Sequence, residues 1–111
     1  METERRRRRG ETLEQALNFQ LAACVEDEGL AAMVLADADG LPLASWGHAA
    51  TCEEAAAFAP FEHGADAARS VRFGSHEFYL CAVGGNELGR RRSLDRSATG
   101  VSRILNRWMV P

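Results

Sequence analysis

Apolar residues recur along this chain at two different spacings, which predict helices in some stretches and strands in others. Leu13, Leu17 and Leu21 follow one another at steps of four, so they form one stripe on a helix that Gly29 is placed to end. Residues 30–36 are almost continuously apolar, as is typical of a strand covered on both faces. The start of the chain therefore predicts a helix that leads into a buried strand.

A tight turn follows that strand at Asp39-Gly40, because glycine readily adopts the left-handed backbone of hairpin turns. Residues 41–46 then form the return strand. Pro42 has no N–H to donate to a ladder, so this strand belongs at the edge of the sheet. The stretch 29–46 predicts a β-hairpin with one buried strand and one edge strand.

Two threonines begin the pattern of a capping box, in which the hydroxyl and a nearby Gln or Glu side chain satisfy N–H groups of the first helical turn. Thr12 predicts the start of the first helix, and Thr51 predicts a short second helix over about residues 52–61, which Pro60 and Gly64 end. The second helix is mostly alanine. Because an alanine face lets another backbone come close, we interpret it as a packing surface, including for a second copy of the chain.

The rest of the chain predicts a second hairpin and a last helix. The hairpin consists of a half-exposed strand over residues 69–73, a two-residue turn that opens with Gly74, and an apolar strand over residues 78–83. The last helix spans about residues 93–108, where Gly100 indicates a close crossing with another element. Its apolar positions recur at steps of three and four: Leu94, Ala98, Val101, Leu105 and Trp108.

The order of these elements is helix, two strands, helix, two strands, helix. Antiparallel hairpins without βαβ crossovers predict an α+β fold. A length of 111 residues suits one domain. We expect a flexible, Arg-rich tail at residues 1–10 and a single domain over residues 11–111.

Charge is distributed unevenly along the chain. All 13 basic residues are arginine, and the formal net charge is −3. Residues 5–9 are a run of arginines, which we interpret as a solvated tail; the alternative is an electrostatic arm for nucleic acid or an anionic membrane surface. No aromatic residue is interleaved with this run and the body of the chain is mildly acidic, so we expect no nucleic-acid binding.

No stretch approaches the roughly 20 apolar residues of a membrane span, and the first ten residues lack the apolar core of a signal peptide. We therefore expect a cytoplasmic protein. Cys24, Cys52 and Cys81 are widely spaced, with no C-x-x-C pair. We expect three free thiols, two of them buried, with Cys81 in the core of an apolar strand.

Three consecutive acids, residues 26–28, lie at the end of the first predicted helix. The helix dipole disfavours negative charge at that end. Two interpretations stay open, a solvated helix end that frays and a surface for a partner.

Three features together resemble a Roadblock/LC7 domain over roughly residues 12–109: the stretch GLAAMVLADADGLPLAS at 29–45, the capped alanine-rich helix, and the strand FYLCAVGG at 78–85. The resemblance implies a central antiparallel sheet of four to five strands with helices on both faces, in a Roadblock/profilin-like arrangement. Family members are not enzymes. They are homodimers that bind and regulate or scaffold small Ras-like GTPases, or are light chains of dynein motors, and bacterial members often act on a GTPase encoded nearby.

The resemblance also implies that the second helix and the third strand of two copies meet, so that their sheets become continuous. By position, the dimer surface consists of Ala55, Ala56, Phe58, Ala59, Ser70, Val71, Arg72 and Phe73. The family usually has three strands between its second and last helices, whereas two are clear in this sequence. Either the sheet has four strands, or a short fifth strand lies near residues 63–68 and shifts the dimer edge.

Two loops have a limited likeness to ligand-binding motifs. Residues 84–91 have the G-x-x-x-x-G spacing of a phosphate loop, but Arg90 and Arg91 occupy the places of its lysine and its Ser or Thr. We interpret this segment as a turn whose arginines are exposed or contact an acidic partner. The acidic turn that ends at Gly40 lacks the further ligands of a calcium loop, so we interpret it as a turn alone.

Cys52 could join His48 and His63 around zinc, or pair with a histidine as a nucleophile, but neither arrangement has the spacing of a known motif. We therefore expect no cofactor, metal or catalytic residue. Trp46 and Trp108 either cover the core or lie in an interface, where tryptophan is enriched.

Three functions are compatible with these patterns. The first is a non-enzymatic Roadblock-like homodimer that binds a small GTPase or another signalling protein. The second is a sensory or ligand-binding domain of PAS or profilin type, which requires a pocket between the sheet and the helices. The third is an enzyme that uses Cys52 with a histidine. The many alanines favour tight packing over a roomy pocket, so the first hypothesis leads.

Overall fold

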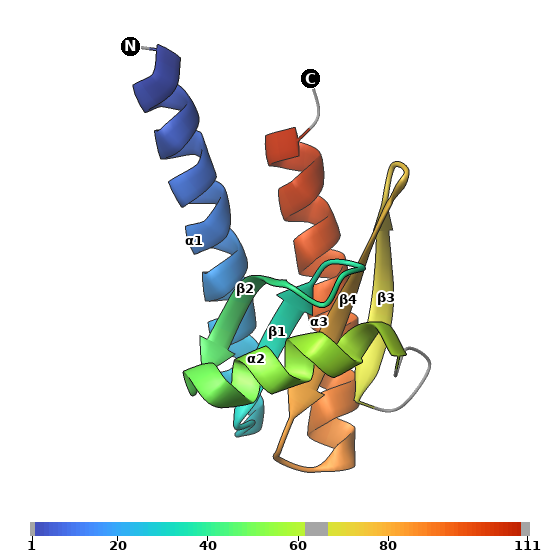
Figure 1. Ribbon diagram of the computed structural model, residues 1–111. Helices are drawn as coiled ribbons and strands as arrows, with labels where there is room; N and C mark the ends of the chain where they lie inside the picture. Colours follow the sequence, from blue (N-terminus) through green and yellow to red (C-terminus); the bar gives the residue numbers. More distant parts are fainter. Residues whose placement is uncertain (1, 62–66, 110–111) are drawn as a thin grey trace.

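The computed structural model describes residues 2–61 and 67–109, which form three helices, four strands and one short 3-10 helix (Figure 1). In chain order the elements are α1 (Glu2–Glu28), β1 (Ala32–Ala36), β2 (Pro42–Gly47), α2 (Ala49–Phe58), η1 (Ala59–Phe61), β3 (Ala68–Phe73), β4 (His76–Val83) and α3 (Glu87–Met109).

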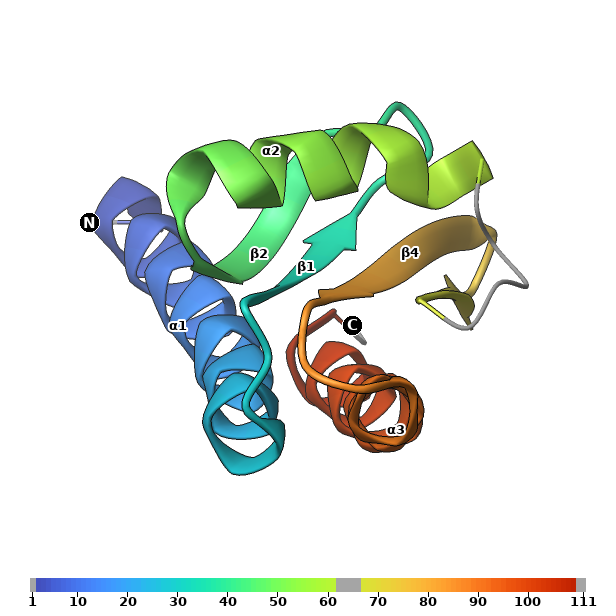
Figure 2. The ribbon, with the colours of Figure 1, turned by 90° about the horizontal axis from the view of Figure 1, so that it is seen from below.

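All four strands belong to one antiparallel sheet with the order β2-β1-β4-β3. Helices α1 and α3 lie on one face of the sheet and α2 lies on the other (Figure 2). The predicted α+β fold is confirmed, and the described residues contain the four-stranded form of its sheet. Most of the stretch where a fifth strand was considered, residues 62–66, is outside the described part of the chain.

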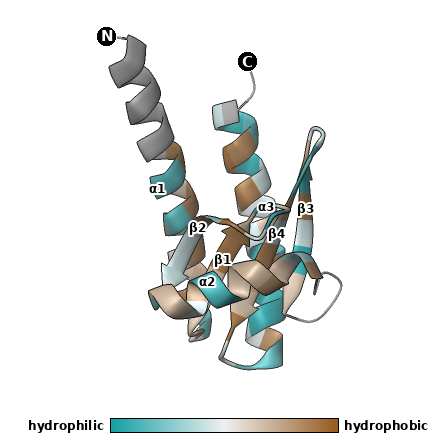
Figure 3. Cartoon of the chain, in the orientation of Figure 1, coloured by the Kyte–Doolittle hydropathy of each residue, from teal (hydrophilic) through white to brown (hydrophobic). Residues whose placement is uncertain are grey.

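The side chains of β1 alternate between the two faces of the sheet. Met33 and Leu35 point toward α1 and α3, whereas Ala32, Val34 and Ala36 point toward α2. All five side chains are buried, because β1 lies between two strands and both faces are covered. The continuous apolar run in the sequence is therefore a central strand, and its brown segment lies in the middle of the molecule (Figure 3).

The turns occur where glycine allows them. Gly40 has a φ of 82°, and the Asp37 carboxylate accepts hydrogen bonds from the backbone N–H groups of Asp39 and Leu41 at 2.9 and 3.0 Å. Gly29 has a φ of 64° and ends α1, as predicted. The acidic turn is thus closed by its own side chain, which confirms the interpretation as a hairpin turn.

All three predicted helix starts are wrong. Helix α3 begins at Glu87, whereas the sequence placed its start at about residue 93. Helix α1 begins at Glu2, so it continues through Thr12 and includes the arginine run that the sequence assigned to a tail. Helix α2 begins at Ala49 after an N-cap at His48, which makes no side-chain capping bond, and Thr51 lies inside the helix. A capping box begins a helix only where the preceding chain leaves the helical conformation, and the residues before Thr12 are mostly Arg and Glu, which favour helix.

Helices α1 and α3 cross closely through small residues. A Cβ atom at Gly100 would collide with the Gln20 side chain, which confirms the predicted close crossing. Ser97 is fully buried there, and its Oγ lies 3.2 Å from the Sγ of Cys24. Small side chains on α3 thus allow the two helices to pack side by side on the sheet.

The acids at the end of α1 have partners on α3. Arg96 donates a hydrogen bond to Asp27 at 2.6 Å, and Arg92 lies 3.8 Å from the Glu28 carboxylate. The hydrogen bond to Asp27 raises the pKa of Arg96. Asp27 and Glu28 thus have partners within the chain, and these ion pairs offset the unfavourable helix dipole.

Candidate interaction surface

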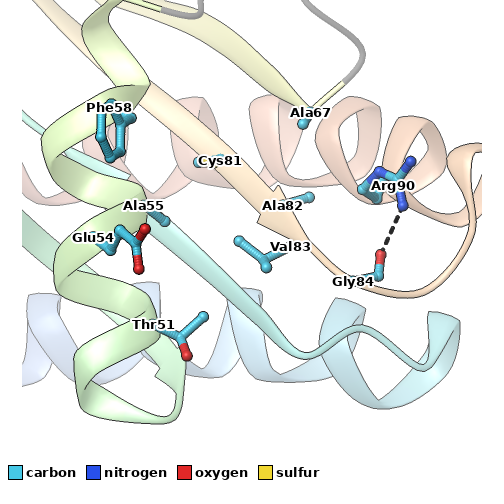
Figure 4. Close-up of a pocket in the computed structure, with 10 residues that line it drawn as sticks. All are labelled: Thr51, Glu54, Ala55, Phe58, Ala67, Cys81, Ala82, Val83, Gly84 and Arg90. Atoms are coloured by element: carbon cyan, nitrogen blue, oxygen red, sulfur yellow. Dashed lines mark hydrogen bonds between the residues drawn. The ribbon is translucent and has the colours of Figure 1, made fainter.

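A groove runs beside α2 on the face of the sheet that α1 and α3 do not cover (Figure 4). Its volume is about 420 Å³. One wall is α2, the floor is the second half of β4, and the far end lies at the start of α3. The lining residues are Thr51, Glu54, Ala55, Phe58, Ala67, Cys81, Ala82, Val83, Gly84 and Arg90.

The helical wall of the groove is a stripe at helical spacing. Thr51, Ala55 and Phe58 recur at steps of four and three, so they lie on one side of α2. Phe58 is 53% exposed and Phe61, one turn further on, is 83% exposed. Phe58 in the wall of the groove and Phe61 beyond it are thus an exposed apolar surface that a partner can cover.

Strand β3 leaves one edge of the sheet unpaired within the described chain. The two-residue turn makes Phe73 and His76 the first hydrogen-bonded pair of the hairpin, and pairs alternate from there. The backbone groups of Ala68, Ser70 and Arg72 therefore point away from β4. An edge strand with free N–H and C=O groups can pair with a strand of another chain.

The eight predicted dimer residues divide into three groups. Ala55 and Phe58 line the groove, and Ser70 and Arg72 are exposed on the β3 edge strand. Four others have their side chains inside the chain's own packing: Ala56 and Ala59 against the sheet, and Val71 and Phe73 in the core beneath α3. Polar and apolar residues alternate along β3 in the sequence. This alternation could have shown that Ser70 and Arg72 lie on the opposite side of the strand from Val71 and Phe73.

Sequence reasoning did not identify the other groove residues. Cys81 and Val83 alternate with core residues on β4, and the sequence alone shows that both lie on the same face of that strand. Whether that face stays partly uncovered depends on where α2 packs. Arg90 closes the far end of the groove. Its guanidinium donates to the carbonyl oxygens of Gly84 and Gly85 at 3.0 and 3.3 Å.

In the segment with phosphate-loop spacing, residues 84–86 form a turn that packs against the residues before β1, whereas residues 87–91 belong to α3. The interpretation as a turn is therefore correct for the first part of the segment only. Gly84 and Gly85 have φ angles of 80° and 63°, and a Cβ at Gly84 would lie 2.8 Å from the Ala31 side chain. The Asn86 side chain accepts the N–H of Gly89 at 2.7 Å, which caps α3. The glycines are therefore explained by backbone geometry and close packing.

The cysteines lie in the interior. Cys24, Cys52 and Cys81 are all free and buried, so the expectation of two buried thiols was too low by one. Burial raises the pKa of the Cys52 thiol, which disfavours the thiolate that a nucleophile needs. His63 is outside the described residues, and within the described part no group of three His, Cys, Asp or Glu side chains is placed to hold a metal ion.

A second opening lies between α1 and α3, on the other face of the sheet. It has a volume of about 320 Å³ and an almost wholly apolar lining, with one carboxylate at Glu14. Its other lining residues are Leu13, Leu17, Leu35, Leu43, Phe78 and Leu105. We call this opening the apolar slot.

The two tryptophans are both accessible in this chain. Trp46 is exposed on β2, and Trp108 is half-buried near the end of α3, with the Arg107 guanidinium 6.0 Å from its ring centre. As for membrane insertion, none of the helices in the described residues has an apolar stretch that could cross a bilayer.

Comparison with known proteins gives matches in structure but not in sequence. No protein-family model matches the chain, and no curated protein matches its sequence. A solved structure described as MglB with tetrameric arrangement matches with a TM-score of 0.59 at 12% identity, over 86% of this chain and 91% of that one. Myxococcus xanthus MglB matches with a TM-score of 0.56 at 12% identity, over 87% and 92%.

A third match is the gliding protein MglB from Thermus thermophilus, with a TM-score of 0.54 at 14% identity, over 86% of this chain and 92% of that one. All three cover nearly the whole of both chains, so the likeness extends to every layer of the fold. The chain has the fold of MglB, which is the Roadblock/LC7 fold that the sequence resemblance implied.

Proposed function

We propose that this chain is a non-enzymatic, Roadblock-like regulator or scaffold that forms a homodimer and binds a small Ras-like GTPase or another signalling protein in the cytoplasm of a bacterium. The observation that carries this proposal is the match to MglB over nearly the full length of both chains. Regulation of small GTPases is the role that the Roadblock resemblance implies, and one of the matching structures has a tetrameric arrangement, which supports assembly of this fold into oligomers.

The groove beside α2 and the β3 edge support a dimer. Both surfaces leave the chain's own packing incomplete, since the groove is open to solvent and β3 has neighbours on one side only in the described part of the chain. A second copy that placed its α2 in the groove would cover Phe58 and bring the two β3 edges together. A contact of this kind uses the same patch on both copies, as a two-fold dimer requires.

The partner proposal is tested with purified components. The Ras-like GTPases encoded near this gene are each mixed with the chain, and binding is measured with GTP-analogue and GDP loading. We expect one of them to bind at least about ten-fold more tightly in one nucleotide state, because a regulator must distinguish the two states. Equal and weak binding to all of them in both states would contradict the GTPase proposal.

The same mixtures test the enzymatic role. The chain alone is expected to hydrolyse no GTP, whereas the matched GTPase is expected to change its hydrolysis rate when the chain is added. A GTPase that binds with no change in rate indicates a scaffold. Hydrolysis by the chain alone would overturn the non-enzymatic proposal.

The apolar slot favours a second candidate function, a small-ligand-binding domain. A volume of about 320 Å³ is at the lower end of ligand pockets, and its lining is apolar as such pockets usually are. Thermal unfolding in the presence of a library of small apolar compounds tests it, since a ligand that binds only the folded chain raises the unfolding temperature. Leu105→Trp, which fills the slot, should remove any such shift.

A further inference from the structure

The two edges of the sheet differ in whether their outward backbone groups are satisfied. On β2, the N–H of Ser45 donates to the side-chain oxygen of Asn18 at 3.0 Å, and both residues are partly buried. Asn18 belongs to α1, which packs along β2. On β3, the N–H groups of Ala68, Ser70 and Arg72 point outward. Within the described part of the chain, no side chain accepts a hydrogen bond from these three groups.

The position of the Asn18 oxygen is that of a strand partner. Ser45 lies opposite Val34, and its N–H points away from β1. The carbonyl oxygen of an incoming strand would therefore accept a hydrogen bond from this N–H. Before Ser45, β2 offers no regular outward N–H. The register shifts between Leu35 and Ala36, which disturbs the ladder there, and Pro42 at the start of the strand has no N–H. A strand arriving at β2 would have to displace the Asn18 side chain.

We propose that Asn18 determines which edge of the sheet pairs with a second copy, by closing the β2 edge and leaving the β3 edge available. This inference rests on the proposed dimer. A chain with two open edges would add copies at both and grow without limit, whereas a chain with one open edge stops at two copies. Asn18 is therefore a specificity residue for assembly rather than a contact between copies.

The test compares Asn18→Ala with Asn18→Asp, which keeps an acceptor oxygen at the same position. The solution mass is measured by light scattering over a range of concentrations, together with hydrogen exchange of the Ser45 amide. Asn18→Ala is expected to form species larger than the wild type as concentration rises, with Ser45 exchange about ten-fold faster, as the loss of one hydrogen bond implies. Asn18→Asp is expected to match the wild type in both measurements.

Asn106→Ala is the control for an asparagine lost from an exposed helix position, and it should leave mass and exchange unchanged. The inference is overturned if Asn18→Ala has the wild-type mass at every concentration, or if Asn18→Asp assembles as Asn18→Ala does. The outcome is separate from that of the proposed dimer. If the wild type is a single chain, the dimer proposal fails, and Asn18→Ala must then form pairs through β2 for the role of Asn18 to stand.

Discussion

The two faces of the sheet are built from neighbouring residues of the same strands, yet they differ in the size of their side chains. The face beneath α1 and α3 buries Leu21, Met33, Leu35, Leu80 and Leu94 completely. The face beneath α2 is covered by alanines, cysteines, two valines and Tyr79. Large side chains remove much apolar area from water, whereas small ones let a helix backbone approach the sheet but contribute less burial.

This difference suggests a division of roles between the faces. The face with α1 and α3 has two long helices and a core of large residues, so most of the burial that stabilises the fold occurs there. The face with α2 has one short helix, a groove beside it and exposed Phe58 and Phe61 at its end. We therefore assign stability mainly to the first face, and the proposed association would use the second.

Leu35→Ala should show the largest effect, because it opens a cavity on the large-residue face. We expect the free energy of unfolding to fall by about 2–5 kcal/mol, measured by urea titration. Val34→Ala is the matched variant, since Val34 is equally buried and points to the other face. It should cost about 1.6 kcal/mol, from two methyl groups at about 0.8 kcal/mol each. Equal losses in the two variants would contradict the assignment of stability to one face.

Phe58→Glu should affect association and not folding. A charge in the groove is expected to weaken dimer formation by about 2–4 kcal/mol, the size seen when a central aromatic contact is lost, while the dilute chain unfolds within about 0.5 kcal/mol of wild type. Sedimentation equilibrium measures the first quantity. Phe19→Glu is the control, because Phe19 is 70% exposed on α1, away from the groove. The assignment fails if both variants weaken the dimer equally.

Ala56→Leu tests whether the α2 face depends on small residues. Ala56 is fully buried between α2 and the sheet, so a larger side chain must push the helix away. The expected loss is about 1–3 kcal/mol in the free energy of unfolding. Ala50→Leu makes the same change at an exposed position of the same helix and should stay within about 0.5 kcal/mol of wild type. An unchanged stability of Ala56→Leu would mean that this face is loosely packed.

Asp27→Asn should have the smallest effect, because its ion pair with Arg96 lies on the surface. We expect a loss of about 0.2–1 kcal/mol that shrinks further in high salt. Urea titrations at low and high salt measure it. A loss as large as that of Leu35→Ala would show that the α1–α3 contact depends on charge rather than on its apolar core.

Local patterns in the sequence were sufficient for the strands and their turns. Gly40 and Gly74 have positive φ angles in the predicted hairpin turns, and the apolar run before Gly40 is the central strand. These features depend on a few adjacent residues. The starts predicted at Thr12 and Thr51 failed because a capping pattern is also compatible with a longer helix, and only the chain that precedes it decides.

The candidate site needed contacts between distant parts of the chain. Val71 and Phe73 lie on one side of the strand that the sequence predicted as half-exposed, but that side could not be assigned to a layer without the position of α3. The groove depends on α2 covering part of β4, and the partners of Asp27 and Glu28 lie on α3, more than 60 residues further along the chain. Neither follows from spacing within one element.

The most direct test of association through the β3 edge is the solution mass of the unmodified chain, compared with that of Ser70→Pro. Ser70→Pro removes an outward N–H of β3 and no N–H that donates to β4, so it should block edge pairing without disturbing the hairpin. Light scattering behind a sizing column should give two chains for the wild type and one for the variant. A folded wild type with the mass of one chain, or a variant that still has the mass of two, would contradict association through this edge.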